Sequence, residues 1–231
     1  MKNFEKMTKK EFAVFIFLAI SSGMIIGISG AASLLANNLY GVWGRLVGAC
    51  LFTLGMYVIV VYEMRLFTGM VSAIPKMGVK NTWRLPAAFF ANIVGVAIVA
   101  VLIYFSPVAD KVLPQAKTLA QDKLDAKLWG LSALCSSILC GVLITLSVWS
   151  VDHAPKKSLS ATLGVIFPIA VFAFCGFDHC IANTLYFYYL GEISWRVVGY
   201  ILLCVLGNLL GGVILPFISL LKEHSKKEKE N

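Results

Sequence analysis

The sequence predicts an all-α integral membrane protein with six transmembrane helices in a single domain that covers residues 1–231. Hydrophobic residues make up 59% of the chain, whereas soluble domains contain about 45–50% apolar residues. The apolar segments are long enough to cross a bilayer, and polar or basic stretches separate them. Two segments contain charged residues in their middle, which indicates helices that are broken inside the membrane.

The first half of the chain contains three apolar segments, and the middle one is interrupted. Residues 12–39 can span about 30 Å of hydrocarbon at about 1.5 Å per residue, and their small residues predict a close-packing surface. Residues 46–62 lead into the charged break Glu63-Met64-Arg65, and the apolar pattern resumes over 66–74. We interpret this stretch as a discontinuous helix; the alternative is that 66–74 is an interfacial tail. Residues 85–105 form an uninterrupted third span.

A polar stretch at residues 106–127 separates the two halves and is expected to be an external loop, with or without a short helix. Three further spans follow over 128–151, 161–190 and 197–221, the second with Pro168 as an additional kink.

The fifth segment is interrupted by the polar sequence Gly-Phe-Asp-His-Cys-Ile-Ala-Asn at residues 176–183. An ionisable side chain at membrane depth is costly and usually faces a protein interior or a water-filled path. His179 is therefore predicted to be a functional residue. The alternative is a core histidine whose hydrogen bonds are satisfied by a neighbouring helix.

Membrane topology explains the positive charge of the chain, and nucleic-acid binding is excluded. The formal net charge is +8, but Lys and Arg occur in short runs between and after the apolar segments. The side of the membrane with more Lys and Arg carries Lys2, Lys6, Lys9, Lys10, Lys76, Lys80, Arg84, Lys156, Lys157, Lys222, Lys226, Lys227 and Lys229. The other side carries Arg45, Lys111, Lys117, Lys123, Lys127 and Arg196. Because the richer side is cytoplasmic, we expect a multi-pass protein of the cell inner (cytoplasmic) membrane with both termini in the cytoplasm.

The three-span pattern occurs twice, as repeat one over about 12–105 and repeat two over about 128–221. In each repeat the middle span is broken and the third carries Asn-x-x-Gly, at Asn92 and at Asn208. An odd number of spans per repeat makes the second repeat enter the membrane in the opposite direction. Inverted repeats of this kind place the substrate path near the midplane, where the positive N-terminal ends of half-helices suit an anion.

The break at residues 176–183 resembles the second signature of the formate/nitrite transporter family, and Leu66-Phe67-Thr68-Gly69 resembles the end of its first signature. The resemblance extends over essentially the whole chain. It implies an aquaporin-like helix arrangement, a homopentamer with a pore in each protomer, and transport of small monovalent anions such as formate, nitrite or hydrosulfide. It also implies that the protein is not an enzyme and needs no cofactor.

The resemblance further implies a polar pore site between two hydrophobic constrictions. The polar residues are His179, Thr68, Asn183, Asn208, Lys127 and Asp178. The constriction residues are Phe52, Met56, Leu66, Phe67 and Phe172. Without the resemblance, the phenylalanines would equally suit core or lipid-facing positions.

The chain departs from the family pattern at three places. Asp178 stands where the family has glutamate, and Glu63-Met64-Arg65 replaces a run of small and acidic residues. The family's vestibule lysine has no match at the ungapped position, which is Asp125. Lys127 fits with a two-residue deletion and Lys123 with an insertion, and we favour Lys127.

The resulting hypothesis is that His179 gives a proton to a weak-acid anion, so that a neutral acid crosses the constrictions. Simple anion conduction past His179 as a fixed donor is the alternative. The rival class is a membrane metal enzyme with Cys175, His179 and Cys180 as ligands. It is disfavoured because His179 and Cys180 would point about 100° apart on a helix and no second zinc-type pair exists, so no metal is expected.

Overall fold

The computed structural model describes residues 7–155, 158–191 and 194–230, and every regular element in these ranges is a helix. Six segments are long and apolar enough to cross a membrane: Lys9–Leu39, Gly44–Val61, Val79–Tyr104, Trp129–His153, Leu159–Leu190 and Trp195–Glu223. The predicted six-span fold is therefore confirmed. Four bases used to predict the orientation lie outside the described residues, namely Lys2, Lys6, Lys156 and Lys157.

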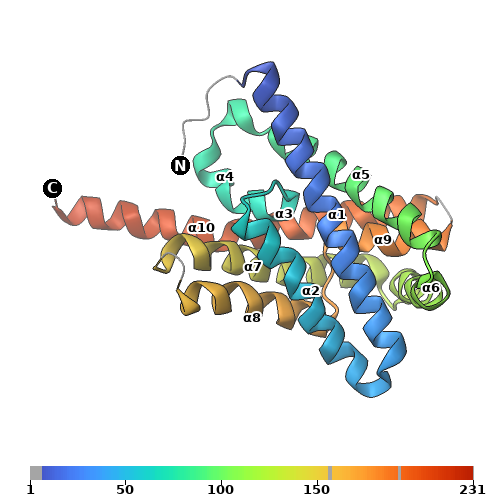
Figure 1. The fold of residues 1–231 in the computed structure, drawn as a ribbon. Helices are drawn as coiled ribbons and strands as arrows, with labels where there is room; N and C mark the ends of the chain where they lie inside the picture. Colours follow the sequence, from blue (N-terminus) through green and yellow to red (C-terminus); the bar gives the residue numbers. More distant parts are fainter. Residues whose placement is uncertain (1–6, 156–157, 192–193, 231) are drawn as a thin grey trace.

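In the first half, α1 (Lys9–Leu39) packs against both α2 (Gly44–Val61) and α5 (Arg84–Tyr104) (Figure 1). The start of α1 is fixed by a capping box, in which Thr8 Oγ1 accepts the Glu11 N–H and the Glu11 carboxylate accepts the Thr8 N–H. The α1–α5 contact depends on glycine, because a Cβ on Gly95 would lie 2.0 Å from the Ile20 carbonyl oxygen. The small residues of the first span thus pack closely inside the protomer.

The second half repeats this arrangement. Helix α7 (Trp129–His153) packs against both α8 (Leu159–Cys175) and α10 (Trp195–Glu230). A Cβ on Gly211 of α10 would lie 2.0 Å from the carbonyl oxygen of Ile138 of α7, as Gly95 does with Ile20 in the first half. Equivalent glycines therefore bring equivalent helix pairs together.

Both predicted helix breaks are present. After α2 the chain leaves the helical conformation and resumes in three short elements, α3 (Phe67–Met70), the 3-10 helix η2 (Val71–Ala73) and α4 (Ile74–Met77). After α8 it turns through Gly176 and resumes in α9 (Cys180–Leu190). Glu63, the residue after the C-cap of α2, has φ 49°, and Gly176, the C-cap of α8, has φ 72°, so each break contains a residue with positive φ. Their positions differ by 113, which relates the two breaks.

The polar stretch between the halves is more regular than expected. It contains α6 (Ala109–Asp125), a 17-residue helix rather than a short one. Val112, Ala116, Ala120 and Leu124 form its buried stripe at four-residue spacing, and the helix packs against α9 and α1. Because the apolar stripe is narrow, most residues of α6 are polar, and the sequence of this segment therefore resembles that of a loop.

The two faces of the bundle are distinguished here by the chain ends. The terminal face carries the start of α1 and the start of α5, which meet where Phe12 packs on Trp83, and the end of α10. On this face Lys76 Nζ lies 3.4 Å from Glu223 Oε1. The opposite face, the loop face, carries the start of α2 and helix α6. Helix α2 starts at the loop face and rises about 27 Å at about 1.5 Å per residue, so the break that follows α2 lies toward the terminal face. Helix α8 runs in the opposite direction, so the break between α8 and α9 lies toward the loop face.

Candidate pore site

The two broken helices meet at a hydrogen bond between Thr68 Oγ1 and His179 Nε2, 2.9 Å long. Thr68 lies in α3 and His179 is the N-cap of α9, so each break contributes one partner. Both side chains are buried, with exposures of 2% and 1%. The structure thus brings together two polar residues that are separated by 111 positions.

The hydrogen bonds of His179 define its tautomer. Nδ1 accepts the N–H of Ala182 at 3.1 Å, because it caps the first turn of α9. Nδ1 therefore carries no hydrogen in the neutral ring, and Nε2 must carry it. It follows that the neutral His179 donates from Nε2 to Thr68 Oγ1.

Asp178 anchors the break on the side of the loop face. Its Oδ1 accepts Lys123 Nζ at 2.6 Å and Asn183 Nδ2 at 2.8 Å, and its own N–H donates to Ser136 Oγ at 3.0 Å. Asn183 also approaches Cys204 Sγ at 3.6 Å. Asn183 therefore holds the carboxylate, and Asp178 is tied to three further helices.

The structure brings Lys123, and not Lys127, to the site. Lys123 lies in the last turn of α6, beside the buried Leu124, and its side chain is 16% exposed. Lys127 lies beyond the end of α6 and is exposed. The preference for Lys127 rested on a gap in a supposed loop, whereas the helical register of α6 turns Lys123 toward the bundle.

Asn208 holds the backbone of the break. Its Oδ1 accepts the Cys180 N–H at 2.9 Å, and its Nδ2 donates to the carbonyls of Ser137 at 2.8 Å and Asp178 at 2.9 Å. All of these groups lie where the helix is interrupted or pack against it, so Asn208 replaces backbone bonds that the break removes.

Asn92 does the same for the first break, and it was absent from the predicted site. Its Oδ1 accepts the Phe67 N–H at 2.8 Å, and its Nδ2 donates to the carbonyls of Ala19 at 2.7 Å and Arg65 at 2.9 Å. The pairs Phe67–Cys180 and Arg65–Asp178 both differ by 113 positions. The repeated Asn-x-x-Gly pattern was the sequence signal that could have identified it.

The predicted constriction residues are all buried, with exposures of 1–4% for Phe52, Met56, Leu66, Phe67 and Phe172. Phe52 and Phe172 meet edge to face with ring centroids 5.4 Å apart, and Phe172 stacks on the His179 ring at 6.0 Å. Phe67 packs instead on Phe89 of α5 at 5.3 Å. Apolar side chains therefore cover the Thr68–His179 pair.

The geometry does not fit the metal-enzyme alternative. Both ring nitrogens of His179 are engaged, by Thr68 and by Ala182. Cys180 is buried whereas Cys175 is exposed, so the supposed ligands lie in different environments. In the part of the chain that the structure describes, no three His, Cys, Asp or Glu residues gather at a spacing that could hold a metal ion.

Comparison with known proteins gives matches over nearly the whole chain. The sequence model of the formate/nitrite transporter family matches residues 1–221. The uncharacterized transporter YrhG of Bacillus subtilis (strain 168) is 27% identical over an alignment of 256 positions. The alignment covers 92% of this chain and 91% of YrhG. The formate channel FocA of Escherichia coli (strain K12) is 28% identical over 190 residues, which cover 77% of this chain and 66% of FocA.

Solved structures show the same fold. A pentameric formate channel with formate bound superposes with a TM-score of 0.77 at 21% identity, over 95% of this chain and 99% of that chain. An ion channel of the same family superposes with a TM-score of 0.79 at 20% identity, over 93% and 91%. Together with the match to the family model, these findings show that the chain belongs to the formate/nitrite transporter family and is a multi-pass membrane channel of that family.

Proposed function

We propose that this protein transports a small monovalent weak-acid anion, formate in the first place, together with a proton through a pore in each protomer of a homopentamer. The observation that carries the proposal is the buried Thr68–His179 pair between apolar side chains. The likeness to the formate channel FocA supports formate over nitrite and hydrosulfide, which remain alternatives within the same function. No enzymatic step is proposed.

The apolar surroundings oppose passage of a bare anion. Stripping a charge of its water in a low-dielectric region costs many kcal/mol, and the Phe52–Phe172 pair leaves His179 only 1% exposed. A neutral acid avoids this cost. We infer that the proton joins the anion at His179, a titratable side chain that lies against these constriction residues in the part of the chain that the structure describes.

The hydrogen bonds of His179 suggest when it becomes protonated. A second proton would go to Nδ1, and this would break the bond from the Ala182 N–H. The lost N-cap bond costs about 1 kcal/mol, and the positive end of α9 also opposes a cationic ring. A neighbouring anion offsets both effects. We propose that His179 is neutral at rest and is protonated only when an anion lies beside it, so that the two charges cross as a neutral acid.

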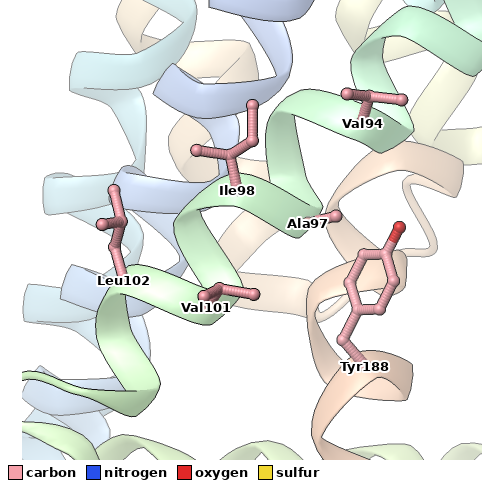
Figure 2. Close-up of a pocket in the computed structure, with 6 residues that line it drawn as sticks. All are labelled: Val94, Ala97, Ile98, Val101, Leu102 and Tyr188. Carbon is pink, nitrogen blue, oxygen red and sulfur yellow. The ribbon is translucent and has the colours of Figure 1, made fainter.

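The homopentamer is supported by an exposed apolar surface on the protomer. Val94, Ala97, Ile98, Val101 and Leu102 of α5 and Tyr188 of α9 line an open apolar groove, which Figure 2 shows from its exposed side. We propose that this groove lies against a neighbouring protomer. The pentameric formate channel of the same fold supports the number five.

The proposed location is the inner (cytoplasmic) membrane with the terminal face in the cytoplasm. Described bases on the terminal face include Lys9, Lys10, Lys76 and Arg84, in agreement with the positive-inside tendency.

A flux assay in proteoliposomes tests the proposed function. Purified protein should release formate from vesicles faster than protein-free vesicles do, and faster than it releases lactate or chloride, with nitrite and hydrosulfide in the same panel. A panel in which chloride crosses as fast as formate would contradict a weak-acid mechanism. Absence of flux for every anion, from protein that is pentameric by native mass spectrometry, would contradict the function itself.

A further inference from the structure

The two helix breaks carry opposite charges at equivalent positions. Arg65 and Asp178 differ by 113 positions, and each offers its main-chain carbonyl to an asparagine Nδ2 at 2.9 Å. Arg65 immediately precedes Leu66, and Asp178 immediately precedes His179. The two halves therefore place an arginine toward the terminal face and a carboxylate toward the loop face.

The side chains of Arg65 and Asp178 have different surroundings. Asp178 is 4% exposed and is neutralised by Lys123 at 2.6 Å. Arg65 is exposed, and no ion pair joins it to any residue within the described ranges. Leu66, the next residue, is 1% exposed and belongs to the apolar constriction. Arg65 thus stands at the point where the solvent-exposed backbone of the break enters the apolar interior.

A second guanidinium adds to the field of Arg65. Arg84, the first residue of α5, lies close enough for the charge of Arg65 to act on it, and it lies over the Trp83 ring at 5.8 Å. Two carboxylates oppose this field. The negative charge of Glu11 attracts Arg84, but the Glu11 carboxylate already accepts the Thr8 N–H. Glu63 is exposed and lies two residues before Arg65.

We propose that Arg65, assisted by Arg84, forms a capture site for the transported anion on the terminal face, separate from the Thr68–His179 site. The inference rests on the proposed transport of a weak-acid anion. A planar carboxylate or nitrite matches the fork of a guanidinium, which is always charged, so capture does not depend on pH. Capture by Arg65 raises the local concentration of the anion on the terminal face. The equilibrium of transport is unchanged, but the KM becomes lower from that face.

The test measures KM for formate from each face in proteoliposomes of uniform orientation, selected by capture of a C-terminal tag. Arg65→Glu should raise KM from the terminal face about tenfold at low ionic strength. It should do so much less at high ionic strength, and KM from the loop face should not change. Arg65→Lys should keep the salt dependence because it keeps the charge. Lys80→Glu is the matched control, since it reverses an exposed charge on the same face away from the break. Glu63→Gln should shift KM in the opposite direction, because it removes a competing carboxylate.

An independent readout avoids dependence on transport. Iodide quenching of the Trp83 fluorescence, taken as the difference between wild type and Trp83→Phe, should fall in Arg65→Glu, whereas quenching by neutral acrylamide should not. Equal KM changes from both faces, or unchanged KM and unchanged iodide quenching, would overturn the capture site even if formate flux is normal. An effect that disappears in vesicles without anionic lipid would assign Arg65 to lipid headgroups and would also overturn it. If no anion is transported but iodide quenching still depends on Arg65, the proposed function fails while the anion site stands.

Discussion

Replacing Asn208 by alanine should destabilise the protein by about 3–9 kcal/mol, because it removes three buried hydrogen bonds to the break. The bonds are those to the Cys180 N–H and to the Ser137 and Asp178 carbonyls, at 2.8–2.9 Å. Each bond contributes about 1 kcal/mol net, and each buried group that loses its partner costs about 1–3 kcal/mol. Asn208 is 1% exposed, so water cannot easily replace the lost partners.

Unfolding by SDS in mixed micelles, followed by circular dichroism, measures this loss, and formate flux should fall with it because Cys180 follows the pore histidine. Asn92→Ala should cost a similar amount, since its three bonds serve the first break in the same way. Thr118→Ala on the exposed face of α6 is the control and should stay within about 0.5 kcal/mol of wild type. Loss of less than about 1 kcal/mol in both asparagine variants would refute the claim that these side chains replace the broken backbone bonds.

Three further predictions concern charge, strain and close packing. Lys123→Met should destabilise the protein by about 3–5 kcal/mol in the same SDS titration, because it leaves a buried carboxylate unpaired, whereas Lys127→Met should be neutral; equal effects would contradict the assignment of Lys123. Glu63→Gly should stabilise by about 1 kcal/mol in thermal unfolding, because residue 63 has φ 49°; destabilisation would show that the carboxylate has a structural partner. Gly211→Ala should abolish assembly on native gels, because its Cβ would lie 2.0 Å from a carbonyl oxygen of α7; a normal pentamer would show that α7 and α10 can move apart.

The transmembrane spans could be predicted from the sequence because hydropathy sets them directly. Residues 85–105 and 128–151 were expected, and α5 covers Arg84–Tyr104 and α7 covers Trp129–His153. The breaks were predictable for the same reason, since charges at Glu63 and Asp178 interrupt apolar runs. Lengths of apolar segments, and charges within them, are local properties of the chain.

Features that depend on three-dimensional contacts were not predictable in the same way. Residues 106–127 were expected to be a loop with or without a short helix, and the length of α6 was missed because its buried stripe is narrow and Pro114 lies inside it. Its register decides which lysine reaches Asp178, and an uncertain loop gap could not give that register. The twin roles of Asn92 and Asn208 require the broken helices to be placed against α5 and α10. Their spacing indicated a repeat, but only the fold shows which backbone groups they bind.

Simultaneous recording of formate flux and proton movement in proteoliposomes tests most directly whether His179 carries a proton with the anion. His179→Asn is the informative variant, because asparagine can still cap the Ala182 N–H of α9 but cannot titrate. We predict that wild-type protein moves a proton with each formate ion, and that the variant assembles as a pentamer but loses both the pH dependence of flux and the proton movement. A variant with wild-type rate, pH profile and proton movement would contradict the claim and leave His179 as a structural cap of α9.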